Sequence, residues 1–179
     1  MSNKINANCG IAVVYLKYND PKQTLENILA SLLKQLSQSL QSVPKPLEEL
    51  FERHRDQNTT PSLDEISGAL LSLIESYPDV FFIIDALDEC TDEVRWELVG
   101  KLRECQPKAR LLITSRFLNG IDQELEDFER LEIKANRADL ELFIDRRIEK
   151  NRNLRAVVLK SPKLRDDIKT AVIKTAEDM

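Results

Sequence analysis

The 179-residue chain has few of the residues that build glycine-rich loops, metal clusters or disulfide frameworks: four glycines, three cysteines and one histidine. The cysteines, Cys9, Cys90 and Cys105, are odd in number and lack the CxxC spacing of a zinc site. Reduced thiols are the simplest interpretation, and they indicate a cytoplasmic protein.

Long apolar runs and an excess of basic residues are also missing. The apolar run at 80–84 is far shorter than the roughly 20 residues that cross a bilayer, and the first ten residues lack the apolar centre of a signal peptide. We therefore expect no membrane contact. The net charge of −5 argues against nucleic acid as the main partner, because phosphate backbones attract basic surfaces.

Apolar segments separated by helical patterns indicate an α/β fold. Strands are predicted at 11–18, 80–84 and 110–114, with a weaker one at 130–134. Helices are predicted from Pro21 to 41 after an Asp20 cap, over 46–55, from a Ser62–Glu65 capping box to Pro78, from Thr91 to about Cys105, and from Asn136 onward. This order predicts a parallel sheet with helices on both faces, three layers in all. We expect the α/β domain over 1–135 and a helical region over 136–179.

Three acids follow the most apolar strand, in the sequence FFIIDALDEC: Asp85, Asp88 and Glu89. In open α/β sheets, ligands bind beyond the carboxyl ends of the strands. Asp85 is placed to hold Mg²⁺ directly or through water. Glu89 could orient or deprotonate an attacking water, and Asp88 could share either role. Alternatively, the acids simply begin a loop and cap the helix near Thr91, but three acids in five residues favour a site.

Two other acid-based chemistries fit the spacing less well. An aspartyl-phosphatase site needs D-x-D directly after the strand, whereas this chain has D-x-x-D-E. A helicase-type D-E-C-H box would use Asp88, Glu89 and Cys90, but Thr91 replaces the histidine.

A polar segment, Thr114, Ser115 and Arg116, follows the next predicted strand. The two strands form a β-α-β unit, so Arg116 should reach the same sheet edge as Asp85. A cation there can contact a terminal phosphate and stabilise developing charge, with Thr114 and Ser115 as supporting donors. The alternative is that Arg116 makes an ordinary surface ion pair with a nearby acid.

A phosphate-binding loop of the type G-x-x-x-x-G-K-[ST] is absent, because none of the four glycines begins a G-K-S or G-K-T triplet. Without the backbone cradle for phosphate, the chain should not hydrolyse ATP alone.

The segments YLKYND, SLDEISGALLSLIESYPDVFFIIDALDEC and ARLLITSR resemble the NACHT domains of STAND-class P-loop NTPases, over about residues 11–150. They are most similar to the nephrocystin-like kind, which is abundant in fungi and often followed by ankyrin or other repeats. The resemblance assigns the Walker B acids to Asp85, Asp88 and Glu89, and the sensor arginine to Arg116. It implies Mg²⁺ and ATP or GTP as cofactors, and a signalling switch driven by nucleotide.

The same resemblance implies what this chain lacks. The family's first strand and P-loop would precede Ile11, and the helix after Asn136 would begin a helical lid. An upstream P-loop segment and downstream repeats would then be its partners. The alternative function is a non-catalytic module that uses the leucine-rich helix at 21–41, or an open sheet edge, to bind a partner or itself.

Overall fold

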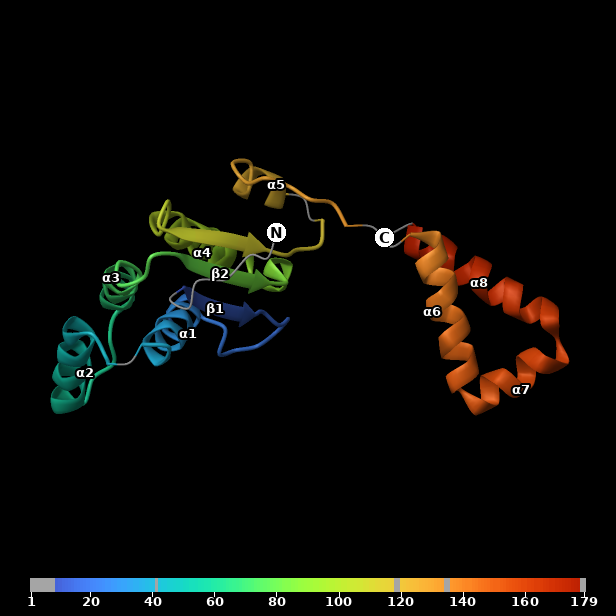
Figure 1. Cartoon of the computed structure of the whole chain (residues 1–179), viewed down its shortest axis with the longest axis horizontal. Helices are drawn as coiled ribbons and strands as arrows, with labels where there is room; N and C mark the ends of the chain where they lie inside the picture. Colours follow the sequence, from blue (N-terminus) through green and yellow to red (C-terminus); the bar gives the residue numbers. More distant parts are fainter. Residues whose placement is uncertain (1–8, 41, 118–119, 134–135, 178–179) are drawn as a thin grey trace. The chain divides into compact units, whose positions relative to one another are not determined.

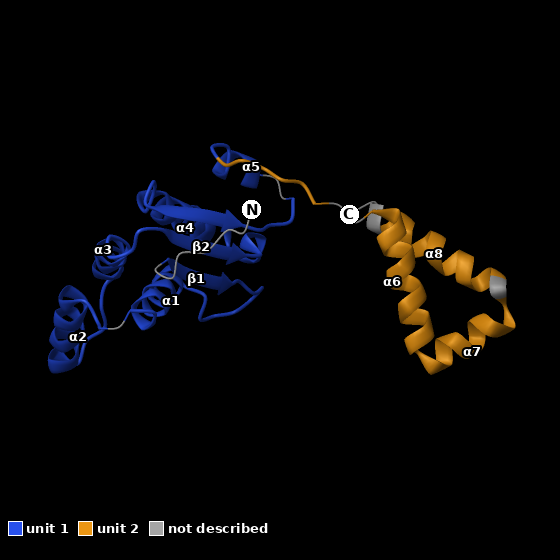
Figure 2. Cartoon of the chain, viewed as in Figure 1, with its two compact units in different colours: residues 1–127 blue, residues 128–179 orange. Residues whose placement is uncertain are grey.

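The computed structural model describes residues 9–40, 42–117, 120–133 and 136–177. The chain divides into two compact units, residues 1–127 and residues 128–179 (Figure 2). This division falls a few residues before the boundary expected at 135.

The described part of unit 1 contains a parallel sheet of three strands, in the order β1-β2-β3 (Figure 1). The strands are β1 (Gly10–Tyr15), β2 (Val80–Asp85) and β3 (Ala109–Ile113). They confirm the predictions at 11–18, 80–84 and 110–114, with ends shifted by a few residues. The weaker strand predicted at 130–134 is wrong: residues 130–133 form no strand, and Lys134 lies outside the described residues. Leu131 and Ile133, whose alternation suggested it, are 83% and 86% exposed, so they have no apolar surface to pack on.

Three helices connect β1 to β2: α1 (Leu25–Gln38), α2 (Lys45–Gln57) and α3 (Leu63–Ile74). The predicted start of α1 at Pro21 is wrong. The side chain of Thr24 accepts a hydrogen bond from the Asn27 N–H and caps the helix. Asp20 instead accepts from the Lys22 N–H at 2.9 Å, which closes a turn before the helix begins.

The capping box that opens α3 is confirmed. The Ser62 hydroxyl accepts from the Glu65 N–H at 3.3 Å, and the Glu65 carboxylate accepts from the Ser62 N–H at 2.9 Å. The hydrogen bond from the Ser62 N–H and the neighbouring His54 side chain lower the pKa of Glu65. The first turn of α3 is therefore fixed by two reciprocal bonds.

Helix α4 (Asp92–Glu104) leads from β2 to β3, and Thr91 caps it as predicted. The short helix α5 (Ile121–Glu124) was not predicted. It is held on α4 by a buried ion pair, in which Arg95 donates to Glu124 at 2.8 and 3.0 Å. These hydrogen bonds raise the pKa of Arg95, so its guanidinium stays charged.

Helices α1, α3 and α4 all pack against one face of the sheet and form the core of unit 1. That face carries Ala12, Val80, Phe82, Ile84 and Ala109, each at most 2% exposed. Burial in β2 alternates strictly between buried and half-buried residues. A continuous apolar run is typical of a strand that is buried on both faces, but only one face of β2 is fully buried.

None of the described helices of unit 1 covers the opposite face of the sheet, which differs from the predicted three-layer arrangement. Ile11, Tyr15 and Leu112 on this face are 47%, 77% and 59% exposed. In the described part of unit 1, one layer of helices packs on one layer of sheet. The sequence pattern could not show this, since alternating helices and strands do not reveal which face each helix takes.

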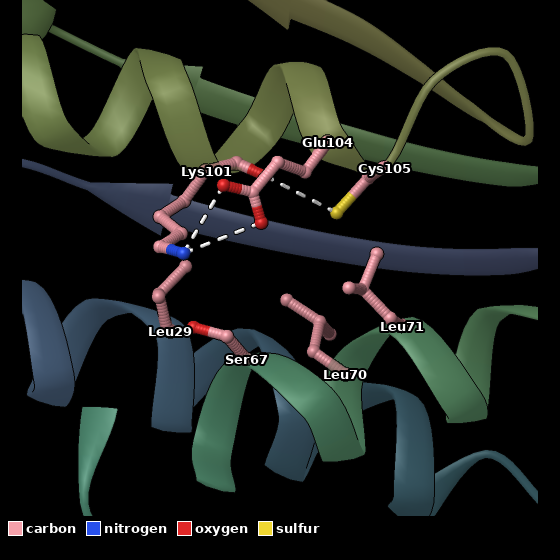
Figure 3. A pocket seen from close by; sticks show the side chains of 7 residues that line it. All are labelled: Leu29, Ser67, Leu70, Leu71, Lys101, Glu104 and Cys105. Atoms are coloured by element: carbon pink, nitrogen blue, oxygen red, sulfur yellow. Dashed lines mark hydrogen bonds and ion pairs between the residues drawn. The ribbon is translucent and has the colours of Figure 1, made fainter. Parts of the chain in front are cut away.

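Helices α1, α3 and α4 meet around a small hollow (Figure 3). Its volume of about 10 Å³ suits at most one water. The Ser67 hydroxyl borders it and has no hydrogen-bond partner among the described residues. Burial raises the pKa of the neighbouring Cys105 thiol to about 11, so this cysteine stays protonated.

Unit 2 contains α6 (Arg137–Lys150), α7 (Arg152–Lys160) and α8 (Pro162–Glu177). The predicted Asn136 cap of α6 is confirmed, because its side chain accepts from the Asp139 N–H at 2.8 Å. The three helices share a small apolar core made by Ile144, Ile148, Val158 and Ile173. Within the described ranges, none of the helices in either unit combines the length and apolarity that a bilayer crossing requires.

Candidate functional site

The acids predicted to form a site lie where β2 ends. Asp85 is the last residue of the strand, and Asp88 and Glu89 follow in a short 3₁₀ turn, Leu87–Glu89. Ala86 makes the turn possible by adopting a left-handed conformation with φ 60°, which is costly for a residue other than glycine. Leu87 is fully buried and anchors the turn to the core.

Thr114 couples the ends of β2 and β3. Its hydroxyl donates to Asp85 Oδ1 at 2.5 Å and accepts from the Ala86 N–H at 2.9 Å. Its carbonyl accepts from the Leu87 N–H at 2.8 Å. The strand register that pairs Ile84 with Ile113 also puts Asp85 opposite Thr114. The predicted meeting of the two strand ends is therefore present.

Arg116 spans the other two acids. Its backbone N–H donates to Asp88 Oδ1 at 3.0 Å, and its side-chain Nε donates to Asp88 Oδ2. Its Nη2 donates to Glu89 Oε1 at 2.8 Å. The exposed fractions of the side chains are 2% for Asp88, 22% for Glu89 and 74% for Arg116. One carboxylate is thus sequestered under the guanidinium, and the other is partly open.

The electrostatics separate the roles that these acids can have. Burial raises the pKa of Asp88, but hydrogen bonds from Arg116 and its positive charge outweigh that effect and hold the pKa below its ordinary value. Hydrogen bonding to Asp88 and the charges of both acids raise the pKa of Arg116. Asp88, with both oxygens engaged and a lowered pKa, is suited to fixing Arg116 and poorly suited to accepting a proton.

An open hollow of about 450 Å³ lies at this edge of the sheet. It is lined by Ala86, Asp88, Glu89, Thr114, Ser115 and Arg116. Ser115 directs its hydroxyl to the carbonyl of Arg116, at 2.8 Å. Five of the six predicted site residues therefore border one depression, and Asp85 adjoins it through Thr114.

The side chains at this edge supply only part of the ligand set of a cation that prefers oxygen ligands, such as Mg²⁺. No group of three His, Cys, Asp or Glu side chains in the described residues is placed to hold a metal ion. Asp85 is the best single candidate. Thr114 donates a hydrogen bond to one of its carboxylate oxygens, and no other described residue engages the second oxygen. Mg²⁺ commonly takes one or two carboxylates and completes its shell with phosphate oxygens and water, so Asp85 suits that role.

Sequence reasoning missed Gln23, which connects the end of β1 to this region. Its side chain accepts from the Lys17 N–H at 2.7 Å, and its Nε2 lies 3.4 Å from Cys90 Sγ and 3.5 Å from the Glu89 carbonyl. No pattern in the sequence pairs a glutamine with residues 66 positions later. Burial raises the pKa of Cys90, so this cysteine acts as a packing residue directly after the acid turn, the 3₁₀ turn Leu87–Glu89.

Comparison with known proteins identifies a family. The family model for the N-terminal region of nephrocystin 3 matches residues 2–116, well over half of the chain. The match ends at Arg116 and so includes every predicted site residue. Neither a curated protein nor a solved structure matches the chain. The chain belongs to the nephrocystin 3, N-terminal family.

Proposed function

We propose that this chain is part of a nucleotide-dependent signalling switch of the NACHT type, and that it carries the metal and sensor half of the nucleotide site. One observation carries the proposal: Arg116 contacts two acids of the β2 turn, while Asp85 and Thr114 meet beside them. This arrangement supports the proposal, because these side chains lie at the carboxyl edge of a parallel sheet, where ligands bind in such folds.

Each residue has a distinct part in this proposal. Asp85 would hold Mg²⁺, which neutralises phosphate charge when it is bound. Glu89, the more exposed acid of the turn, would orient the attacking water. Thr114, Ser115 and Arg116 would contact the terminal phosphate of ATP or GTP. Asp88 would be a positioning residue that holds Arg116.

The phosphate-binding loop would come from a segment outside these 179 residues. The free edge of β3 suits a further strand, because the backbone groups of Leu111 and Ile113 point away from β2 and have no partner in the described residues. A strand added there would end beside Thr114 and Arg116. Such a segment would supply the glycine-rich cradle that the chain lacks.

The test fuses a segment that contains a P-loop ahead of the chain and measures ATP binding with and without Mg²⁺. We expect Mg²⁺-dependent binding in the fusion and none in the chain alone. Asp85→Ala should weaken binding at least tenfold, and Glu89→Gln should block turnover while leaving binding intact. Leu159→Ala, a change at an exposed residue of unit 2, serves as the control. ATP binding in the fusion that is unaffected by Asp85→Ala would refute the metal role.

A second candidate function is a non-catalytic interaction module, which is favoured by the uncovered apolar face of the sheet. Interaction through that face would not depend on Mg²⁺ or ATP. Light scattering with and without Mg²⁺-ATP separates the two candidates, because only the switch should change its assembly state on nucleotide addition.

A further inference from the structure

The uncovered face of the sheet presents a regular grid of side chains from all three strands. The register aligns them in three rows. From the amino to the carboxyl ends of the strands, the rows are Ile11–Phe81–Arg110, Val13–Ile83–Leu112 and Tyr15–Asp85–Thr114. The first two rows are apolar except for Arg110. A parallel sheet is normally buried on both faces, so this exposure is unusual.

The two ends of this face differ in charge. At the amino end, Arg110 lies over the Phe81 ring, 5.4 Å from its centre, and its side chain is 68% exposed. Its ion pair with Asp79, at 3.2 Å, is a surface pair that contributes little and exchanges readily. At the carboxyl ends of β2 and β3, the acids Asp85, Asp88 and Glu89 outnumber Arg116, so this part of the edge is acidic.

We propose that the uncovered face binds a second copy of this chain, with the strands of the two sheets running in opposite directions. A twofold axis through the Val13–Ile83–Leu112 row places this apolar row against itself. The same axis puts Arg110 of each copy over Thr114 and next to Asp85 of the other. Arg110 of each copy then meets the acidic end of its partner, which makes the face complementary to itself. The interface requires neither nucleotide nor metal.

The size of the face predicts a weak dimer. Three strands about 4.8 Å apart and six residues long span roughly 14 by 20 Å. Such a footprint covers roughly 280 Å² on each copy and about 560 Å² in total, a size found only in weak interfaces. Dissociation constants in the micromolar range or weaker follow, so the dimer should appear as concentration rises.

The experiment is sedimentation equilibrium of the full chain across about 1–300 μM, for the unchanged protein and three variants. Leu112→Glu places an unpaired charge in the central row and should weaken dimerisation at least tenfold. Arg110→Glu reverses the charge at the amino end and should also weaken it. Leu159→Glu is the matched control, because Leu159 is an equally apolar residue, 71% exposed, on α7. Circular dichroism of each variant checks that the fold is kept.

A concentration-dependent dimer that Leu112→Glu and Arg110→Glu disrupt and Leu159→Glu leaves intact supports the proposal. A chain that remains monomeric throughout would overturn it, and would mean that another segment or a different protein covers the face. A dimer that survives Leu112→Glu would place the contact elsewhere and overturn it as well.

Discussion

At the scale of single residues, the site depends on Asp88, a carboxylate buried beneath an exposed arginine. The bonds from Arg116 lower the pKa of Asp88, so folding favours the ionised form. The stabilisation is therefore present above the ordinary aspartate pKa of about 3.9 and is lost as the pH falls through the lower folded value.

This linkage predicts that Asp88→Asn costs about 1 kcal/mol at pH 7, a value reduced because Arg116 is largely exposed. The cost should shrink as the pH falls from 7 toward 3, because Asp88 then becomes protonated in the unfolded chain and, at still lower pH, in the folded protein. Urea unfolding of the two proteins at both pH values measures it. An equal cost at both pH values would show that the charge of Asp88 does not stabilise the fold.

Gly10 is the residue at which the packing leaves no room for a side chain. A Cβ atom there would lie 2.9 Å from Leu36 Cδ2 and 3.2 Å from the Tyr77 ring. Tyr77 cannot easily move, because its hydroxyl donates to the Leu36 carbonyl at 2.5 Å.

We therefore expect Gly10→Ala to lower the free energy of unfolding by about 1–3 kcal/mol. Gly100→Ala is the control, since Gly100 lies in α4 with no atom within 4 Å of its added Cβ. That change should raise stability by about 0.5–1 kcal/mol. Denaturant unfolding measures the free energy of unfolding of both variants. If both substitutions changed it in the same direction, this account would be contradicted.

At the scale of elements, the outer edge of β1 is closed by a side chain. Gln35 of α1 donates from Nε2 to the Val13 carbonyl at 2.8 Å and accepts at Oε1 from the Val13 N–H at 2.9 Å. A glutamine amide thus takes the place of one residue of a neighbouring strand. Edge strands with free backbone groups invite pairing with other chains, so this contact protects β1.

Gln35→Ala should destabilise unit 1 by about 1–2 kcal/mol, because two backbone groups lose their partners. It should also increase aggregation, measured as the rise in light scattering during incubation at a fixed temperature. Gln38→Ala, at the exposed end of the same helix, should do neither. Equal behaviour of the two variants would mean that water replaces the Gln35 amide without loss.

The elements also show what a sequence can predict. Strands 80–85 and 109–113 and the caps Ser62, Thr91 and Asn136 were predictable, because local patterns and capping residues specify them. The convergence of the acids with Arg116 followed from the β-α-β connection alone. Arg95–Glu124 and Gln35–Val13 join distant positions through side-chain geometry, and no local pattern encodes such pairs.

At the scale of the whole molecule, the two compact units predict separate behaviour. Residues 129–133 are exposed and form neither helix nor strand, which makes them accessible to proteases. We expect limited trypsin digestion to cut first between residues 127 and 137. The product should be a stable amino-terminal fragment, identified by mass spectrometry. First cuts within α1 or α4 would show that unit 1 is less stable than the connection.

The buried pair between Arg95 and Glu124 has a mechanical consequence. Helix α4 starts just after the acid turn and also carries α5, which follows Arg116 in the chain. Arg116 therefore lies between β3, which follows α4 in the chain, and α5, which is bound to α4 by the Arg95–Glu124 pair. A ligand that moved Arg116 away from Asp88 and Glu89 would therefore strain the contact between α4 and α5 and displace α5.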